Sequence, residues 1–292
     1  MRFGFRLWGV CAIALLASAG AAMAWGPEGH QVVARIAARH LEPQARQQVE
    51  ILLGAPAAES MAALSSWADW QGRARPETKP WHYVDIPIDA AGYVSARDCR
   101  DGQCVVAAIA REEATLADGA QSREARREAL LWVIHLAGDI HQPLHCADDN
   151  HRGGNDVPVS IGVLDSNLHR VWDSNEVWQL GIEAAPLAAR LDRTITPPQE
   201  KAWSRGTPAD WANEAHALAR GIYARLPAAR PVPMARPGML RDSPIAARQL
   251  EKAGIRLAFL INQALGSRSQ RRAAAVEADS ARPYFRRRRT KP

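Results

Sequence analysis

The stretch His135-Leu-Ala-Gly-Asp139-Ile-His141-Gln-Pro-Leu-His145 carries the strongest pattern in the chain. The run before it, 126–134, predicts a helix with one apolar side. His135 and Asp139 are four residues apart, so they share one face of that helix and can hold a single ion. Pro143 is expected to end the helix and to turn His145 toward a different point nearby.

The same spacing recurs further along the chain in His169-Arg-Val-Trp-Asp173. An imidazole nitrogen combined with a carboxylate oxygen is a ligand set typical of zinc. A single His-x-x-x-Asp pair is usually only a surface contact along a helix. Two such pairs with a further histidine in a short span indicate a metal site.

Residues 1–24 have the features of a secretory signal: Arg2 and Arg6, an apolar run over 7–16, and a small-residue cleavage site ending at Ala24. The apolar run is too short to cross a bilayer, and no other stretch is apolar enough. We therefore expect an exported protein, periplasmic or extracellular, without a membrane span. Its mature chain would begin at Trp25.

The net charge of +6 lies at the two ends of the chain. Residues 268–292 hold nine Lys and Arg against two acids, so the body, 25–267, has a small net negative charge. We expect this basic tail to be solvated and disordered because of its composition. Binding of the tail to nucleic acid or to an anionic surface is the alternative.

Residues 25–267 are dominated by helical periodicity and contain no obvious interdomain linker, so we expect one all-α, mostly helical domain. A loop or small hairpin is predicted over 151–165, and a short strand or loop over 81–87. Helices are predicted over 43–53, 61–70 and 104–118, with Ser122 capping the helix that follows.

Two later helices are expected to start with the same device, a capping residue followed by proline. These starts are Thr207-Pro208 and Ser243-Pro244, and the second helix should end at Gly266.

Removal of the signal leaves three cysteines. Cys99 and Cys104 flank a turn-forming loop and are expected to pair in an oxidising compartment. Cys146 is expected to be a buried free thiol, with a role as zinc ligand as the alternative.

Taken together, these motifs resemble the zinc-dependent single-strand-specific nucleases of the S-one/P-one type. The resemblance covers residues 25 to about 265 and rests on seven pieces in family order. These are Trp25 at a cleaved N-terminus, His30, Ser-Trp-Ala-Asp69, Trp-His82-Tyr-Val-Asp, His135-x3-Asp139-x5-His145, Gly-Gly-Asn-Asp156 and Asn-Leu-His169-x-Val-Trp-Asp173.

The resemblance implies three Zn²⁺ ions. The first would be held by Asp69, His82, His135 and Asp139. The second would be held by the α-amino nitrogen and carbonyl oxygen of Trp25, with His30 and again Asp139. The third would be held by His145, His169 and Asp173, with open positions for water or substrate, as in catalytic zinc sites.

Asp139 would therefore bridge two ions, and two close cations lower the pKa of a water between them. Asp85 is expected to orient the attacking water by hydrogen bonding, with a purely structural role as the alternative. The remaining histidines, His40, His141, His151 and His216, are not expected to bind metal.

Arg73, Asn155 and Asp156 are the candidate substrate-binding residues. The family places an Arg three residues after the aspartate that corresponds to Asp69. In this chain that position is Gly72, so Arg73 is expected to take the role by a shift of one residue.

The resemblance implies an endonuclease that hydrolyses single-stranded DNA and RNA to 5′-phosphorylated products and also acts on 3′-mononucleotides, as a monomer. A secreted zinc-dependent phospholipase C is the alternative enzyme. A non-catalytic zinc-binding envelope protein is the alternative of another class. A phosphohydrolase of the HD type is excluded, because the His-Asp dipeptide that it needs is absent.

Overall fold

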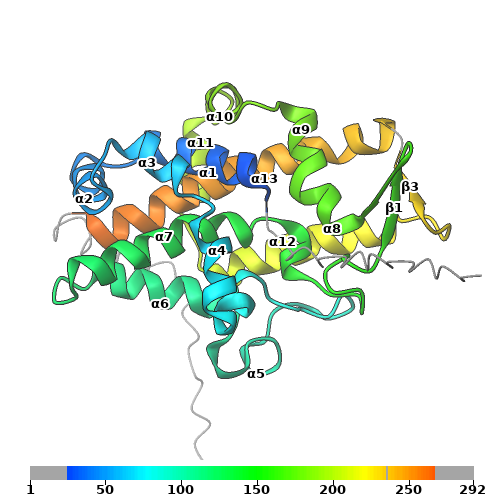
Figure 1. Ribbon diagram of the computed structural model, residues 1–292, viewed down its shortest axis with the longest axis horizontal. Helices are drawn as coiled ribbons and strands as arrows, with labels where there is room; N and C mark the ends of the chain where they lie inside the picture. The colour runs from blue at the N-terminus through cyan, green and yellow to red at the C-terminus, as the bar shows by residue number, and fades with distance from the viewer. Residues whose placement is uncertain (1–24, 235, 267–292) are drawn as a thin grey trace, which may run out of the picture.

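The computed structural model describes residues 25–234 and 236–266, and helices make up most of this part of the chain (Figure 1). The prediction of a mostly helical protein with a small hairpin is confirmed. The expected signal, 1–24, and the expected tail, 268–292, lie outside the described residues.

The longer helices follow one another along the chain as α1 (Pro27–Arg39), α2 (Pro43–Leu53), α3 (Ala57–Ala63), α4 (Trp67–Ala74), α6 (Val105–Ala117), α7 (Arg123–Asp139), α9 (Glu176–Leu180), α10 (Ala184–Asp192), α11 (Pro197–Trp203), α12 (Pro208–Ala224) and α13 (Arg236–Leu265). Shorter helical segments are η1 (Pro76–His82), α5 (Ser95–Asp98), η2 (Arg100–Gly102), η3 (Pro143–Cys146), α8 (Leu168–Arg170) and the π-helix η4 (Val171–Asn175).

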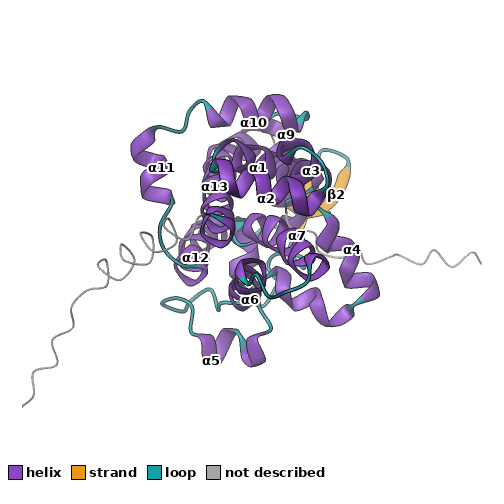
Figure 2. Ribbon diagram, turned by 90° about the vertical axis from the view of Figure 1, so that its left-hand side faces the viewer, coloured by secondary structure: helices purple, strands orange, loops and turns teal. Residues whose placement is uncertain are grey.

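Helix α7 lies at the centre of the fold. Every residue from Ala129 to Asp139 is buried, because α1, α2, α4, α6 and α13 pack around it. A helix that is covered on all sides needs an apolar sequence all round, and the run Ala129–Ile134 supplies it. Figure 2 shows α7 and α13 near the centre, with α10 at the top and α6 near the bottom.

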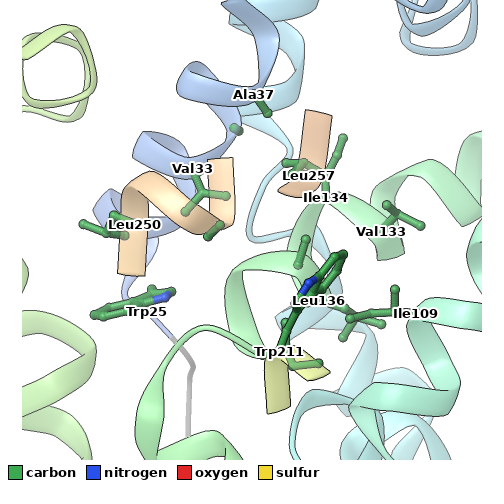
Figure 3. Close-up of a cluster of buried hydrophobic side chains, with 14 of the residues drawn as sticks. Trp25, Val33, Ala37, Ile109, Val133, Ile134, Leu136, Trp211, Leu250 and Leu257 are labelled. Carbon is green, nitrogen blue, oxygen red and sulfur yellow. The ribbon is translucent and has the colours of Figure 1, made fainter. Parts of the chain in front are cut away.

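The core joins α1, α7 and α13. Val33, Ile134 and Leu257 are fully or almost fully buried there, and Figure 3 shows them with Trp25 and Trp211. Trp25 is itself fully buried, so the first described residue is part of the core. Polar groups that α7 carries at its end are thereby enclosed by apolar side chains.

A small sheet lies beside α8, with strand order β2-β1-β3. Strands β1 (Pro158–Ile161) and β2 (Leu164–Asn167) form an antiparallel hairpin, and β3 (Val232–Pro233) pairs parallel to β1. The hairpin predicted within 151–165 is confirmed, with its second strand running on to Asn167. Asn167 then caps α8 by accepting a hydrogen bond from the Arg170 amide.

The helix predicted over 61–70 is wrong as a single element. The chain forms α3 and α4 with a break at 64–66. The Ser65 carbonyl in this break lies 2.8 Å from Nδ1 of His135, so the interruption supplies an acceptor to the metal-type motif. The segment 81–87 is a loop whose first two residues end η1, and only Pro87 forms a β-bridge, with Asp148.

The prediction that Ser243-Pro244 starts a helix is also wrong. Helix α13 begins at Arg236 and contains Pro244 in its interior. The Ser243 hydroxyl donates to the Glu176 carboxylate at 2.7 Å, so it is used in packing between helices. The corresponding prediction for Thr207-Pro208 is confirmed, since Thr207 caps α12.

Cys99 and Cys104 form the predicted disulfide, and Cys146 is a buried free thiol. Burial raises the pKa of that thiol. Within 25–234 and 236–266, no helix has both the length and the apolar content that a bilayer span requires.

Candidate metal centre

Residues from four separate elements meet around Asp139. His30 comes from α1, Asp69 from α4, His82 from the end of η1, and His135 from α7 itself. All of these side chains are buried or nearly so. Packing of α1 and α4 against α7 and the contact of α4 with η1 bring these distant segments together.

Asp139 lies between three imidazoles. Its Oδ2 is 2.9 Å from Nδ1 of His82 and 3.3 Å from Nε2 of His135, and its Oδ1 is 3.3 Å from Nε2 of His30. Asp69 joins the cluster through His135, with 3.3 Å between Oδ1 and Nε2. One carboxylate therefore faces two sides of the cluster, which is the arrangement of a bridging ligand.

A second cluster lies beside the first and contains His145 from η3, His169 from α8 and Asp173 from the π-helix η4. The Nε2 atoms of the two histidines are 3.1 Å apart, and Nε2 of His169 is 3.6 Å from the Asp173 carboxylate. A hydrogen bond also links the two clusters: Nδ1 of His145 lies 2.7 Å from the carbonyl oxygen of His82.

Among the described residues, three groups bring possible ligand atoms within 4.8 Å of one another. They are His30, His135 and Asp139; Asp69, His82 and His135; and His145, His169 and Asp173. The structure thus brings together the eight side chains that the sequence singled out as ligands.

Trp25 lies beside these groups. The Gly26 amide donates to the Asp173 carbonyl at 2.7 Å, which holds the start of the described chain against η4. Trp25 is also close to Gly138: a Cβ added there would lie 3.8 Å from the indole and 2.7 Å from Nδ1 of His30. Trp25 and His30 are therefore packed together against the α7 motif.

The orientation of three imidazoles follows from backbone carbonyls. Nδ1 of His135, His145 and His169 lies 2.7–2.8 Å from the carbonyls of Ser65, His82 and Gly153 respectively. A carbonyl only accepts, so each Nδ1 carries a proton, and in the neutral imidazole Nε2 presents a lone pair. The Nε2 atoms face one another or carboxylates, an arrangement that is favourable when a proton or a metal cation lies between them.

Unpartnered polar atoms support the same conclusion. Both ring nitrogens of His30, Oδ2 of Asp69 and Oδ1 of Asp139 are buried without a hydrogen-bond partner. Buried polar atoms normally have partners, and bound ions are one reason for exceptions. Nitrogen and carboxylate oxygen donors at these positions fit divalent zinc.

Burial keeps several of these groups in the form that binds metal. Burial, with the neighbouring His135, lowers the pKa of His30 to about 3, and burial with His145 lowers that of His169 to about 3. Both imidazoles are therefore neutral near pH 7, as ligation requires. Burial works against the Asp139 carboxylate, but His135 and His82 hold its pKa well below the usual value.

Two supporting residues were not anticipated from the sequence. Gln142 is fully buried and donates to the Asp173 carboxylate at 2.7 Å. Asp148 accepts from the amides of His151 and Gly153, which positions the carbonyl that orients His169. The position of Gln142 inside the His135–His145 motif could have indicated its role, whereas no feature of the sequence pointed to Asp148.

The other candidate site residues lie outside the three groups. Asp85 is exposed, and partial loss of solvent around its carboxylate, with Asp148 and Asp98 nearby, raises its pKa to about 6. Asn155 and Asp156 belong to the loop before β1, where both contact Arg152. Arg73 is exposed near the end of α4, with its guanidinium over the Trp70 ring.

The remaining histidines stay outside the clusters, as expected. His141 is buried between the Ala137 carbonyl and Arg256. His40 contacts Asp192 and Glu200, and His216 contacts the Pro87 carbonyl. His151 is in the loop that precedes Asn155, with its side chain partly exposed.

A mostly helical domain in which histidines and aspartates form adjoining clusters has the features of a metal-binding protein. Comparison with known sequences makes this specific: the S1/P1 nuclease family matches residues 25–266. The chain belongs to this family.

Individual relatives are similar over different lengths. Endonuclease 4 of Arabidopsis thaliana is 30% identical over 92% of this chain and 98% of its own length. Endonuclease 2 of the same plant is 38% identical over 52% of this chain, and Nuclease P1 of Penicillium citrinum is 33% identical over 51%. The chain spans little more than half the length of these last two relatives, at 55% and 57%.

Proposed function

We propose that the protein is an exported, monomeric zinc-dependent endonuclease that hydrolyses single-stranded DNA and RNA to 5′-phosphorylated products and also acts on 3′-mononucleotides. Family membership supports the nuclease class and not the alternative of a phospholipase C. The observation that carries the proposal is the position of Asp139 within 3.3 Å of three imidazoles, beside a second histidine–aspartate cluster.

Three zinc ions would use the ligand sets expected from the sequence. Asp69, His82, His135 and Asp139 would hold the first, and His145, His169 and Asp173 the third. The backbone of Trp25 with His30 and Asp139 would hold the second, which the packing of Trp25 against His30 supports. Bound zinc would supply Lewis acidity toward water and a phosphoryl oxygen.

The residues of the chain would position the reacting groups. Carbonyl hydrogen bonds to Nδ1 hold His135, His145 and His169 with Nε2 directed inward, and such outer contacts tune ligands. Asp85, with a pKa of about 6, is proposed to accept a hydrogen bond from the attacking water. Asn155 and Asp156, on the loop that holds His169, and Arg73, on α4, would contact the substrate.

The burial of the proposed metal ligands supports a preference for single-stranded substrates. His30, His135 and Asp139 are fully or almost fully buried, so a phosphodiester must reach below the surface. A flexible single strand can do so, whereas a stiff duplex is held at the rim. Export is proposed from the signal-like residues 1–24.

The proposal is tested by zinc analysis of the purified mature protein together with hydrolysis of single-stranded and duplex DNA. Asp139→Asn should lower kcat by at least roughly 100-fold, since mutation of groups that build a metal site removes most of the electrostatic stabilisation. It should also reduce the bound zinc. His40→Gln, at a histidine outside the clusters, is the control. Near-normal turnover by folded Asp139→Asn protein would contradict the bridging role.

A further inference from the structure

Trp70 is the most exposed tryptophan in the described part of the chain, with 61% of its surface accessible. It directly follows Asp69, whose carboxylate belongs to the metal-type cluster. A tryptophan side chain at the surface presents a large flat apolar face on which the ring of a ligand can stack. Position and exposure thus single out this side chain.

Two cations lie on either side of Asp69 on α4. The Arg73 guanidinium is 4.9 Å from the centre of the Trp70 ring. The Lys79 side chain, from η1, crosses α4 at Gly72, where an added Cβ would be 3.3 Å from its Cγ. Within the described ranges, neither cation has a carboxylate at ion-pair distance, so both charges are available to an anion.

Other arginine–tryptophan contacts nearby differ in this respect. Arg75 lies over Trp67 but forms an ion pair with Glu128 at 2.6 Å. Arg111 lies over Trp81 but pairs with Glu112. Their charges are therefore neutralised, and only the Trp70 contact combines an exposed ring with unneutralised cations in this part of the described structure.

Helix geometry places this group beside the cluster. With 3.6 residues per turn, Arg73 lies roughly 40° around α4 from Asp69 and roughly 60° from Trp70. Lys79 lies on η1, whose last residue is His82. Gly72, on which Lys79 packs, lies roughly 60° from Asp69 in the other direction and roughly 160° from Trp70. The surface formed by Trp70, Arg73 and Lys79, here called the α4 surface, thus extends on both sides of the proposed ligand Asp69.

We propose that the α4 surface is a subsite that binds a nucleotide of the strand beyond the two that flank the scissile phosphate. Trp70 would stack on the base, and Arg73 and Lys79 would bind phosphate. Aromatic stacking combined with cations is the usual way that proteins hold single strands without reading sequence. The inference rests on the proposed nuclease function and extends it to substrates longer than a dinucleotide.

The test compares a long oligothymidylate with the dinucleotide thymidylyl-thymidine as substrates of the zinc-loaded protein. Trp70→Ala should raise KM for the oligonucleotide by roughly 5- to 100-fold, as expected for loss of one stacked base. Hydrolysis of the dinucleotide should stay unchanged, and Trp70→Phe should restore oligonucleotide binding. Zinc content and circular dichroism verify that each variant is folded and loaded.

Charge is tested separately. Arg73→Gln and Lys79→Gln should each reduce the slope of log KM against log salt by about 0.7 for the oligonucleotide, the value for one phosphate contact on a single strand. Arg193→Gln is the matched control, since this exposed arginine follows α10, which packs on α1 and α13. It should leave the slope unchanged.

The outcomes separate the two proposals. If the wild-type protein hydrolyses both substrates and Trp70→Ala changes neither, or weakens both equally, the subsite is wrong while the nuclease function stands. If the loaded wild-type protein hydrolyses neither substrate, the nuclease function is wrong and the subsite with it.

Discussion

At the residue scale, the clusters depend on small residues that let the histidines approach, as well as on the histidines and aspartates themselves. Gly138 lies between His135 and Asp139 in the motif, and His30 packs directly against it. Any side chain at this position would occupy the space of the His30 imidazole. The glycine therefore allows α1 to bring its histidine to Asp139.

Gly138→Ala tests this point. An alanine normally stabilises a helix interior by up to about 1 kcal/mol, but its Cβ would be 2.7 Å from Nδ1 and 2.9 Å from Cε1 of buried His30. We expect a net loss of about 1–3 kcal/mol in unfolding free energy and weaker zinc binding. Denaturant unfolding and zinc titration measure both.

Gly119→Ala is the matched control, because nothing lies within 4 Å of a Cβ added there. It should change stability by no more than about 0.5 kcal/mol. Equal behaviour of the two variants would show that Gly138 has no role in seating His30.

At the element scale, α7 organises the site because it carries two of the proposed ligands and packs against α1, α2, α4, α6 and α13. Its start is capped by Ser122, whose hydroxyl accepts from the Ala125 amide at 3.1 Å. Its last residue is Asp139, and η3 follows with His145. The cap thus stabilises the helix from the end opposite to the ligands.

Ser122→Ala should therefore lower the unfolding free energy by about 1 kcal/mol, the usual effect of losing such a cap. The kcat of the zinc-loaded protein should remain close to that of the wild type, because the site is at the other end of α7. Ser122→Asp, which keeps an acceptor, should retain stability in the same denaturant titration. A large fall in kcat for Ser122→Ala would contradict this separation.

At the scale of the whole molecule, the clusters connect α1, α4, η1 and α7 with the segment from η3 to η4. In both clusters, buried imidazole nitrogens and carboxylates face one another. Bound ions would hold these elements together, so metal binding and folding should be coupled.

Chelation should lower the melting temperature by roughly 5–10 °C for each ion lost, if zinc was present at about a hundredfold above its Kd. Scanning calorimetry before chelation, after it, and after zinc is restored gives the measurement. An unchanged melting temperature after verified metal loss would rule out a structural contribution.

Much of the site was predictable because its pieces are local. His135 with Asp139 and His169 with Asp173 stand four residues apart on helical segments, and Cys99 with Cys104 enclose a short turn. Predictions failed where tertiary packing overrode a pattern of neighbouring residues. Pro244 was expected to start a helix but lies inside α13, and the helix predicted over 61–70 is broken at Ser65. Neither outcome could be read from periodicity, since Ser65 and Ser243 both contact residues remote in the sequence.

The sequence by itself determined the helical fold class, the spacing of the ligand pairs and the cap at Thr207, because covalent geometry and the helical period act between near neighbours. Only the tertiary structure decided that Asp139 lies within 3.3 Å of three imidazoles, that Ser65 orients His135, and that Lys79 packs on Gly72. Most of these contacts join residues far apart in the chain, and all of them depend on how the helices pack into one core.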